Sequence, residues 1–370
     1  MFQAPLPKEY TELTSEETRE RIRKAKQTLG KRLIILGHHY QRDEIIEHAD
    51  YRGDSLKLAQ DALKHPEAEF IVFCGVHFMA ESADIVTPDH VKVILPNLAA
   101  GCSMADMANL FQVRSCWKQL EETLGDLSVK NEKWKILPVT YINSAANLKA
   151  FVGEREGVVC TSSNASKIVQ WAFQNADKVL FFPDQHLGRN TGVKLGLHHE
   201  KDMCLWDPHQ PMGGNSADKI KESKLILWKG HCSVHTRFTP EQVIEARKKY
   251  PDVKVIVHPE CPMEVVQLAD EVGSTSTIVR IVESSPDGTT WAIGTEINLV
   301  NRLAKENPGK KIFSLDPMIC PCSTMYRIHP SFLCWALENI VKGTPVNVIE
   351  VPPKVKHFAK LALDRMLALS

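Results

Sequence analysis

The chain has 370 residues, which suggests two or three domains of ordinary size. Hydrophobic residues make up 43% and charged residues 24%, which excludes collagen-like, coiled-coil and largely disordered chains. The 45 basic residues balance 45 acidic ones, so neither a nucleic acid nor a membrane is an expected partner. No apolar run reaches the length of a membrane span, and the first residues do not resemble a targeting peptide, so we expect a cytoplasmic protein.

Helix and strand signals alternate along most of the chain. Thr14 and Glu17 form a capping box and Gly30 can end a helix, so we expect a helix over 15–29. Short apolar and β-branched runs predict strands at 33–36, 70–73, 91–95, 136–141, 158–161, 179–182, 225–228, 253–257, 276–281, 290–293 and 311–315. Most of these runs are separated by helical patterns.

Three segments share the order apolar strand, polar loop, helix. Their loops begin near His38, Tyr141 and His258, at intervals of roughly a hundred residues. Because alternating strands and helices form parallel sheets, we expect an α/β protein of three analogous three-layer α/β/α units. We assign the units to 1–110 together with C-terminal helices in 330–370, to 111–222, and to 223–329. Within the second unit, 188–221 lacks periodicity and is expected to be an inserted loop.

The residues that follow the predicted strands carry most of the reactive side chains. In open parallel sheets, ligands bind beyond the carboxyl ends of the strands. This rule selects His38, Tyr40, His77, Asn97, Cys102, Tyr141, Asn143, Ser162, Asp184, His186, Cys232, His235, His258, Glu260, Thr295, Glu296, Cys320 and Cys322. Acids, bases and potential metal ligands are therefore expected at one edge of each sheet.

Cysteine occurs at one predicted strand end in each unit, as Cys102, Cys232, and either Cys320 or Cys322. Three thiolates can bind a four-iron cluster and leave one iron open as a Lewis acid. The alternative, which is commoner for cysteines, is a role as small buried hydrophobic residues. Five cysteines with apolar neighbours are expected in the core, namely Cys74, Cys116, Cys160, Cys204 and Cys334. Cys261 fits either role.

Small hydroxyl residues recur where loops pass between elements, at 53–55, 161–163 and 273–276. Hydroxyls and free amides at helix starts bind phosphate or carboxylate, although each segment alone could be a simple helix cap. Their recurrence in three similar units favours a small substrate with several negative charges.

His258 and Glu260 form a potential acid–base pair, with Tyr40 or Tyr141 as a proton relay. A zinc ion is an alternative ligand for the histidines at strand ends. The candidates are His38, His39, His235 and His258. No H-E-x-x-H spacing supports zinc.

An ordered series of motifs resembles one enzyme family. The series consists of GHHYQRDEI, GDSLKLA, GVHFMAESADI, TYINSAANLKA, CTSSNASKIV, FPDQHLGRN, GHCSVHTRF, VHPECP, GSTSTI and GTEINLV. Over essentially its whole length, the chain is similar to the quinolinate synthases, the A proteins of bacterial NAD and pyridine nucleotide biosynthesis.

The resemblance implies three α/β/α domains around a pseudo-threefold axis and a [4Fe-4S] cluster with three cysteine ligands and one open iron. The implied reaction is a transferase-type condensation of iminoaspartate with dihydroxyacetone phosphate to quinolinate, with release of phosphate and two waters. The open iron would act as the Lewis acid. An aspartate oxidase is the expected source of iminoaspartate.

Matched positions imply a set of site residues. The cluster ligands would be Cys102, Cys232 and Cys322, with Cys320 as the alternative third ligand. The implied substrate-binding residues are His38, Ser55, Tyr141, Asn143, Ser162, His258, Glu260, Ser274 and Thr275. The expected catalytic residues are the base Glu260, its relay Tyr40 and His258, and the neighbours Tyr141 and His235. A zinc-dependent hydrolase and a non-enzymatic iron–sulfur carrier are the alternative functions.

Overall fold

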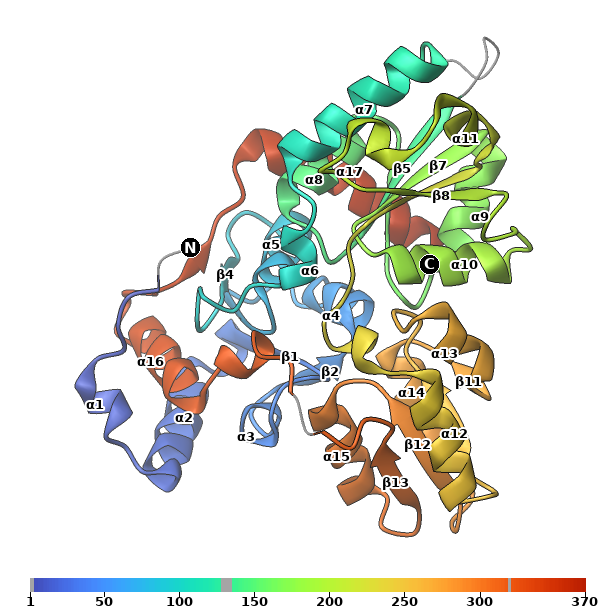
Figure 1. Cartoon of the computed structure of the whole chain (residues 1–370). Coiled ribbons are helices and arrows are strands. Elements are labelled where there is room, and N and C mark those ends of the chain that lie inside the picture. Colours follow the sequence, from blue (N-terminus) through green and yellow to red (C-terminus); the bar gives the residue numbers. More distant parts are fainter. Residues whose placement is uncertain (1–2, 128–134, 319–320) are drawn as a thin grey trace. The chain divides into compact units, whose positions relative to one another are not determined.

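The computed structural model describes residues 3–127, 135–318 and 321–370. It contains three sheets of mostly parallel strands flanked by helices, so the predicted α/β class is confirmed (Figure 1). The chain divides into two compact units. The first lies within Met1–Cys102, Glu296–Pro308 and Met318–Val351, and the second within Ser103–Thr295, Gly309–Pro317 and Pro352–Ser370. In the described part of the chain, no helix has the length and apolar character needed to cross a membrane.

The first unit contains a five-stranded sheet in the order β14-β4-β3-β1-β2. Its strands are β1 (Leu33–His38), β2 (Tyr51–Gly53), β3 (Phe70–Cys74), β4 (Lys92–Ile94) and β14 (Val348–Ile349). β14 pairs antiparallel with β4, and the other pairs are parallel. Every residue of β3 is buried, as expected for a strand covered on both faces of its sheet.

The first unit also contains helices, some of which contact this sheet. They are α1 (Lys8–Thr11), α2 (Ser15–Leu29), α3 (Asp43–Ile46), α4 (Ser55–Ala62), α5 (His77–Val86), α15 (Ile297–Glu306) and α16 (Pro330–Val341). The predicted capping box of α2 is confirmed, because Thr14 Oγ1 accepts from Glu17 N at 3.2 Å and Thr14 N donates to Glu17 Oε2 at 2.8 Å. α2 packs against α16 (Figure 1), and Arg21 and Glu338 join them through two hydrogen bonds.

The second unit contains two sheets of parallel strands. One has the order β6-β5-β7-β9-β8 and the other β11-β10-β12-β13. The strands are β5 (Ile136–Tyr141), β6 (Val158–Cys160), β7 (Lys178–Phe182), β8 (Met203–Trp206), β9 (Leu225–Trp228), β10 (Lys254–Val257), β11 (Glu271–Val272), β12 (Thr290–Gly294) and β13 (Lys311–Ser314). All residues of β5, β7 and β9 are buried, so the core of this unit follows the middle of its larger sheet.

Ten helices of the second unit accompany these sheets in the described residues. They are α6 (Ser103–Asp106), α7 (Leu110–Leu124), α8 (Ala146–Gly153), α9 (Ala165–Asn175), α10 (Gln185–Lys194), α11 (Ala217–Glu222), α12 (Pro240–Lys249), α13 (Met263–Leu268), α14 (Thr275–Ser284) and α17 (Pro353–Leu369). α17 packs along α8 and against β6 (Figure 1). A Cβ on Gly153 would lie 1.9 Å from the Phe358 carbonyl oxygen, so only glycine permits this close approach.

Two predictions about local structure are wrong. The segment 276–281 is predicted as a strand but lies in α14, because Ser274 caps this helix and Ile278 and Val282 form one buried face. The segment 188–221 is not an inserted loop, since it contains the end of α10, all of β8 and most of α11. Gly188 of this segment serves close packing rather than a turn, because a Cβ there would lie 2.5 Å from Leu227.

Four short strands were not predicted, namely β2, β8, β11 and β14, and each of them forms an edge of its sheet. The C-terminal helices, both grouped with the first unit in the sequence, divide between the two units: α16 packs on α2, and α17 packs on α8. The boundaries of the three α/β units stay a prediction.

Candidate active site

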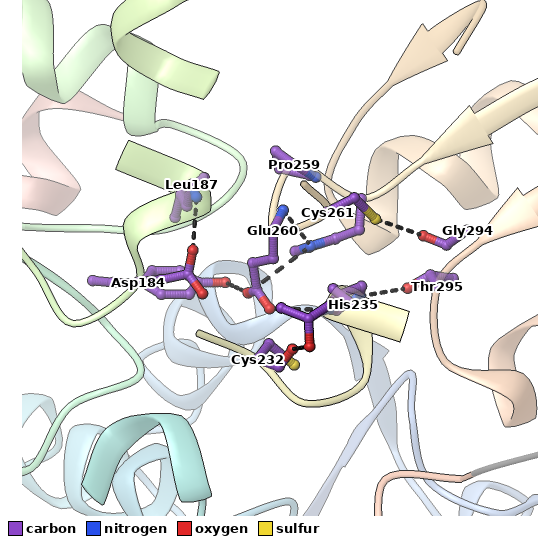
Figure 2. A network of polar contacts seen from close by, with 12 residues as sticks. Asp184, Leu187, Cys232, His235, Pro259, Glu260, Cys261, Gly294 and Thr295 are labelled. Carbon is purple, nitrogen blue, oxygen red and sulfur yellow. Dashed lines mark hydrogen bonds and ion pairs between the residues drawn. The ribbon is translucent and has the colours of Figure 1, made fainter. Parts of the chain in front are cut away.

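The carboxylate of Glu260 lies at the centre of a buried polar cluster in the second unit (Figure 2). Its Oε1 accepts a hydrogen bond from the Tyr141 hydroxyl at 2.5 Å, and its Oε2 accepts one from His235 Nδ1 at 2.8 Å. Because His235 donates through Nδ1, the Nε2 of its neutral ring can accept from Thr295 Oγ1 at 3.3 Å. His258 Nδ1 lies 3.9 Å from Oε1. The ends of β5, β10 and β12 therefore supply side chains to one cluster.

The two imidazoles are held against each other and against Glu260. The rings of His235 and His258 stack, with centroids 4.4 Å apart and planes inclined by 20°. His258 Nδ1 accepts the backbone N–H of Glu260 at 3.3 Å, so the neutral ring carries its proton on Nε2. The ring of His258 is thus fixed by the loop that it shares with Glu260.

Charge in this cluster favours an ionised Glu260. Burial by itself raises the pKa of Glu260, but His258 and His235 in their protonated, charged forms outweigh it. With the hydrogen bonds from His235 and Tyr141, they hold this pKa well below its ordinary range. It follows that the proton affinity of Glu260 depends on the charge of the two imidazoles.

Asp184 is a second buried carboxyl, and Figure 2 shows Glu260 between Asp184 and His235. Its Oδ1 caps α10 by accepting from Leu187 N at 2.7 Å. Burial and the negative charge of Glu260 raise the pKa of Asp184 well above its ordinary value, against the opposing effect of backbone N–H groups that include that of Cys232. Two neighbouring carboxyls that favour different protonation states are typical of acid–base sites.

Cys232, His235 and Glu260 could together bind a metal ion. Each offers one ligand atom, and these atoms lie within 4.8 Å of one another. Thiolate, imidazole and carboxylate are all ligands of zinc. Thr295 and Tyr141 would then be the hydrogen-bond partners that orient His235 and Glu260.

The described cysteines fall into two classes by exposure. The three partly exposed ones are Cys102, Cys232 and Cys322. Burial raises the pKa of the other thiols, namely those of Cys74, Cys116, Cys160, Cys204, Cys261 and Cys334. Since metals bind the thiolate, a thiol that keeps its proton is a poor ligand. Of the cysteines that the structure describes, the three partly exposed ones therefore suit an iron–sulfur cluster best. Cys320 lies outside the described residues.

Predicted substrate-binding residues of the second unit also stand at strand ends. Asn143 follows β5, Ser162 follows β6, and Ser274 and Thr275 follow β11. Asn143 Oδ1 and Thr275 Oγ1 are buried and have no hydrogen-bond partner within the described part of the chain. Buried polar atoms normally have a partner, so these two atoms are candidates for contacts with a ligand.

The first unit holds the other predicted residues. His38 ends β1, and its buried Nδ1 accepts from the backbone N of Tyr40 at 3.1 Å. The two rings meet edge to face with centroids 4.8 Å apart. Ser55 begins α4, and Cys322 N donates to the Glu296 carboxylate at 3.2 Å. The structure thus pairs His38 with Tyr40 in the first unit, as it groups Tyr141 with Glu260 in the second.

Three residues near Glu260 were assigned no role from the sequence. Asp184 and Thr295 were selected as strand-end residues, but residue type did not reveal their partners. Asn190 contacts the loop of Glu260 from the middle of α10, where no strand-end rule applies. The signal that could have found it is the motif FPDQHLGRN, which ends on this asparagine.

Comparisons with known proteins agree with the motifs. The family model described as "Quinolinate synthetase A protein" matches residues 20–368. A quinolinate synthase of Corynebacterium glutamicum is 56% identical over 99% of this chain and 91% of its own length. The quinolinate synthase of a Geobacillus species is 53% identical over 99% of this chain and 97% of its own. That of Acidobacterium capsulatum is 54% identical over 97% and 95%.

Proposed function

Since the chain belongs to the family of the quinolinate synthetase A protein, we propose that it condenses iminoaspartate with dihydroxyacetone phosphate to form quinolinate. The other products are one phosphate and two waters, so the reaction balances without an external oxidant or reductant. Protons must leave carbon atoms and reach departing oxygen atoms, which calls for a positioned base and acid. In this proposal an aspartate oxidase supplies the iminoaspartate.

The Glu260 cluster is the observation that carries the proposal. The charges of His258 and His235 hold the pKa of its carboxyl low against the effect of burial, and Tyr141 and His235 hydrogen-bond to its two oxygens. When the imidazoles lose positive charge, burial favours the neutral carboxyl, so Glu260 can accept a carbon-bound proton. His258 shares its loop and is the proposed relay. Tyr40, in the first unit, is the second proposed relay residue.

Both proposed substrates carry several negative charges. Ser274 and Thr275 form the N-terminal end of α14, where backbone N–H groups and the buried Thr275 hydroxyl could hold a phosphate. Asn143 and Ser162 are proposed to bind the carboxylates. His38 and Ser55 are the proposed contacts from the first unit.

A [4Fe-4S] cluster would be held by Cys102, Cys232 and Cys322, with Cys320 as the alternative third ligand. The support is that these three are the partly exposed cysteines of the described chain. When bound, the cluster would supply an open iron as a Lewis acid for loss of a substrate hydroxyl. The Cys232 thiol lies within 4.8 Å of ligand atoms of His235 and Glu260, so ligand and base would belong to one site.

Metal analysis tests this function directly. The protein and its Cys102→Ala, Cys232→Ala, Cys320→Ala and Cys322→Ala variants are purified without oxygen, and iron, sulfide and zinc are counted beside a visible spectrum and a quinolinate assay. We expect about four irons and four sulfides per chain, lost together with activity in three of the four variants. Cys334→Ala, a change of a buried cysteine, is the control and should keep both.

A zinc-dependent hydrolase is the second candidate, because Cys232, His235 and Glu260 could also bind one zinc ion. A colourless protein with about one zinc per chain, lost in Glu260→Gln but kept in Cys102→Ala, would replace the first proposal with this one. A protein that binds the cluster but makes no quinolinate from the two substrates would be an iron–sulfur carrier.

A further inference from the structure

The side chain of Asn190, in α10, hydrogen-bonds to the loop that carries Glu260. Its side chain is 8% exposed, and its Nδ2 donates to the Pro259 carbonyl at 2.8 Å and to the Cys261 carbonyl at 2.9 Å. Carbonyl oxygens only accept, so these two partners also fix which end of the amide faces the loop. The two bonds hold the carbonyl groups of the residues that precede and follow Glu260.

We propose that Asn190 is a positioning residue that sets the direction of the Glu260 side chain. This inference rests on the role of Glu260 in the proposed function. The carboxylate must meet Tyr141 at 2.5 Å and His235 at 2.8 Å together, and a small rotation of its backbone would break one of these contacts. General bases lose much of their effect when displaced by about 1 Å.

The position of Asn190 is itself fixed, because α10 is capped and packs closely on a sheet. Asp184 caps its first turn. At Gly192 an added Cβ would lie 2.5 Å from the Met203 side chain, so the helix sits directly on the strands of the larger sheet. Through Asn190, this sheet fixes a loop that follows β10 of the smaller sheet. The geometry of the Glu260 cluster therefore depends on both sheets of the second unit.

The variant Asn190→Asp distinguishes a role of Asn190 in positioning Glu260 from a role in packing alone. Aspartate has the shape of asparagine, but its carboxylate repels the two carbonyls, whereas its protonated form regains one donor. We expect kcat to fall about 10- to 100-fold at pH 8 and KM to change less. Because burial favours the neutral acid, the activity relative to wild type should recover as the pH is lowered. Asn190→Ala removes both donors without adding charge and should lose activity without this recovery.

Asn215→Asp is the matched control. Asn215 Nδ2 donates to the carbonyls of Leu205, Met212 and Gly213, so it holds a loop by the same chemistry. This variant should lose thermal stability as Asn190→Asp does, but keep kcat and the wild-type pH profile. Amide hydrogen exchange should rise at 258–262 in the Asn190 variants only.

The following results distinguish a failure of the positioning role of Asn190 from a failure of the proposed function. An Asn190→Asp variant with wild-type kcat, or one that matches Asn190→Ala at every pH, overturns the positioning role. An active Glu260→Gln variant, measured in parallel, would instead remove the base and with it the proposed mechanism. Iron content at the wild-type level in all Asn190 variants is also expected, because the hydrogen bonds that the Asn190 amide donates go to Pro259 and Cys261, which are not proposed cluster ligands.

Discussion

Glu260 and Lys178 are both buried charged residues of the second unit, but their surroundings differ in kind. Lys178 is 1% exposed, and its ammonium group donates to the backbone carbonyls of Lys221 at 2.5 Å and Ser223 at 2.6 Å. The partners of Glu260 are instead titratable side chains, the phenol of Tyr141 and the imidazole of His235.

This difference distinguishes a buried charge that only stabilises the fold from one that can take part in proton transfer. A backbone carbonyl does not take up or release a proton near neutral pH, so the bonds of Lys178 join the end of α11 to β7 without offering a site for proton transfer. A phenol and an imidazole can each donate or accept a proton, so Glu260 can exchange protons with its partners during a reaction. Burial raises the cost of an unmatched charge at both places. Only the identity of the partners shows which buried charge can do chemistry.

Removing the charge of Glu260 should have the largest effect on activity. Glu260→Gln keeps the shape and can still hydrogen-bond to Tyr141 and His235, but it cannot accept a proton. We expect kcat to fall about 1000-fold with normal circular dichroism and normal iron content. Glu271→Gln, an exposed carboxyl on β11, is the control and should be fully active. A fully active Glu260→Gln would show that the cluster is structural, like the site of Lys178.

Removing one hydrogen bond to Glu260 should have a smaller effect. Tyr141→Phe deletes the hydroxyl that donates at 2.5 Å, and a bond to a charged group is worth about 1.5–3 kcal/mol. We expect kcat to fall roughly tenfold or more, measured as separate kcat and KM values. Tyr250→Phe, which lies outside the cluster, should change neither value. An unchanged kcat in Tyr141→Phe would mean that His235 alone orients the carboxylate.

Most of the strand framework could be predicted from the sequence, because buried parallel strands are short apolar runs. The runs at 136–141 and 225–228 match β5 and β9 to the residue. The rule that ligands gather at carboxyl ends of strands also selected Tyr141, His235 and Glu260. The helix α14 was missed because its threonines and valines suit a strand locally, whereas its Ser274 cap and buried face depend on the neighbouring elements.

Contacts between residues of different helices, strands and loops could not be predicted from the sequence. Nothing local to Asn190 indicates that it meets Pro259 and Cys261, since these residues are 69 and 71 positions away. Lys178 directly precedes the predicted strand 179–182, and a lysine at such a position would usually be exposed, yet the fold brings two carbonyls to it. Such partners come from tertiary packing, and residue type alone does not name them.

Removing the charge of Lys178 should change stability and leave chemistry intact. Lys178→Met keeps much of the volume but leaves the carbonyls of Lys221 and Ser223 without this donor. We expect the free energy of unfolding to fall by about 2 kcal/mol, with kcat unchanged. Lys224→Met, which removes an exposed lysine paired with Asp202 at 3.2 Å, should cost less than about 1 kcal/mol. A large loss of kcat in Lys178→Met at wild-type stability would show that the charge of Lys178 takes part in the chemistry.

The last prediction concerns the pH dependence of stability at the same site. Burial lowers the pKa of Lys178 from 10.5 to about 8 in the folded chain. Between these values the unfolded chain still holds a proton that the folded chain has released, so this group makes the free energy of unfolding rise with pH. Titrating groups distant from Lys178 contribute equally to wild type and Lys178→Met, and Cys204, whose pKa the Lys178 charge lowers, is changed to alanine in both proteins. The stability difference between the two, from urea titrations, should therefore be constant below pH 8 and grow toward pH 10.5. If this difference in the free energy of unfolding does not change with pH, the two carbonyls stabilise the ammonium charge as fully as the imidazoles stabilise the Glu260 carboxylate.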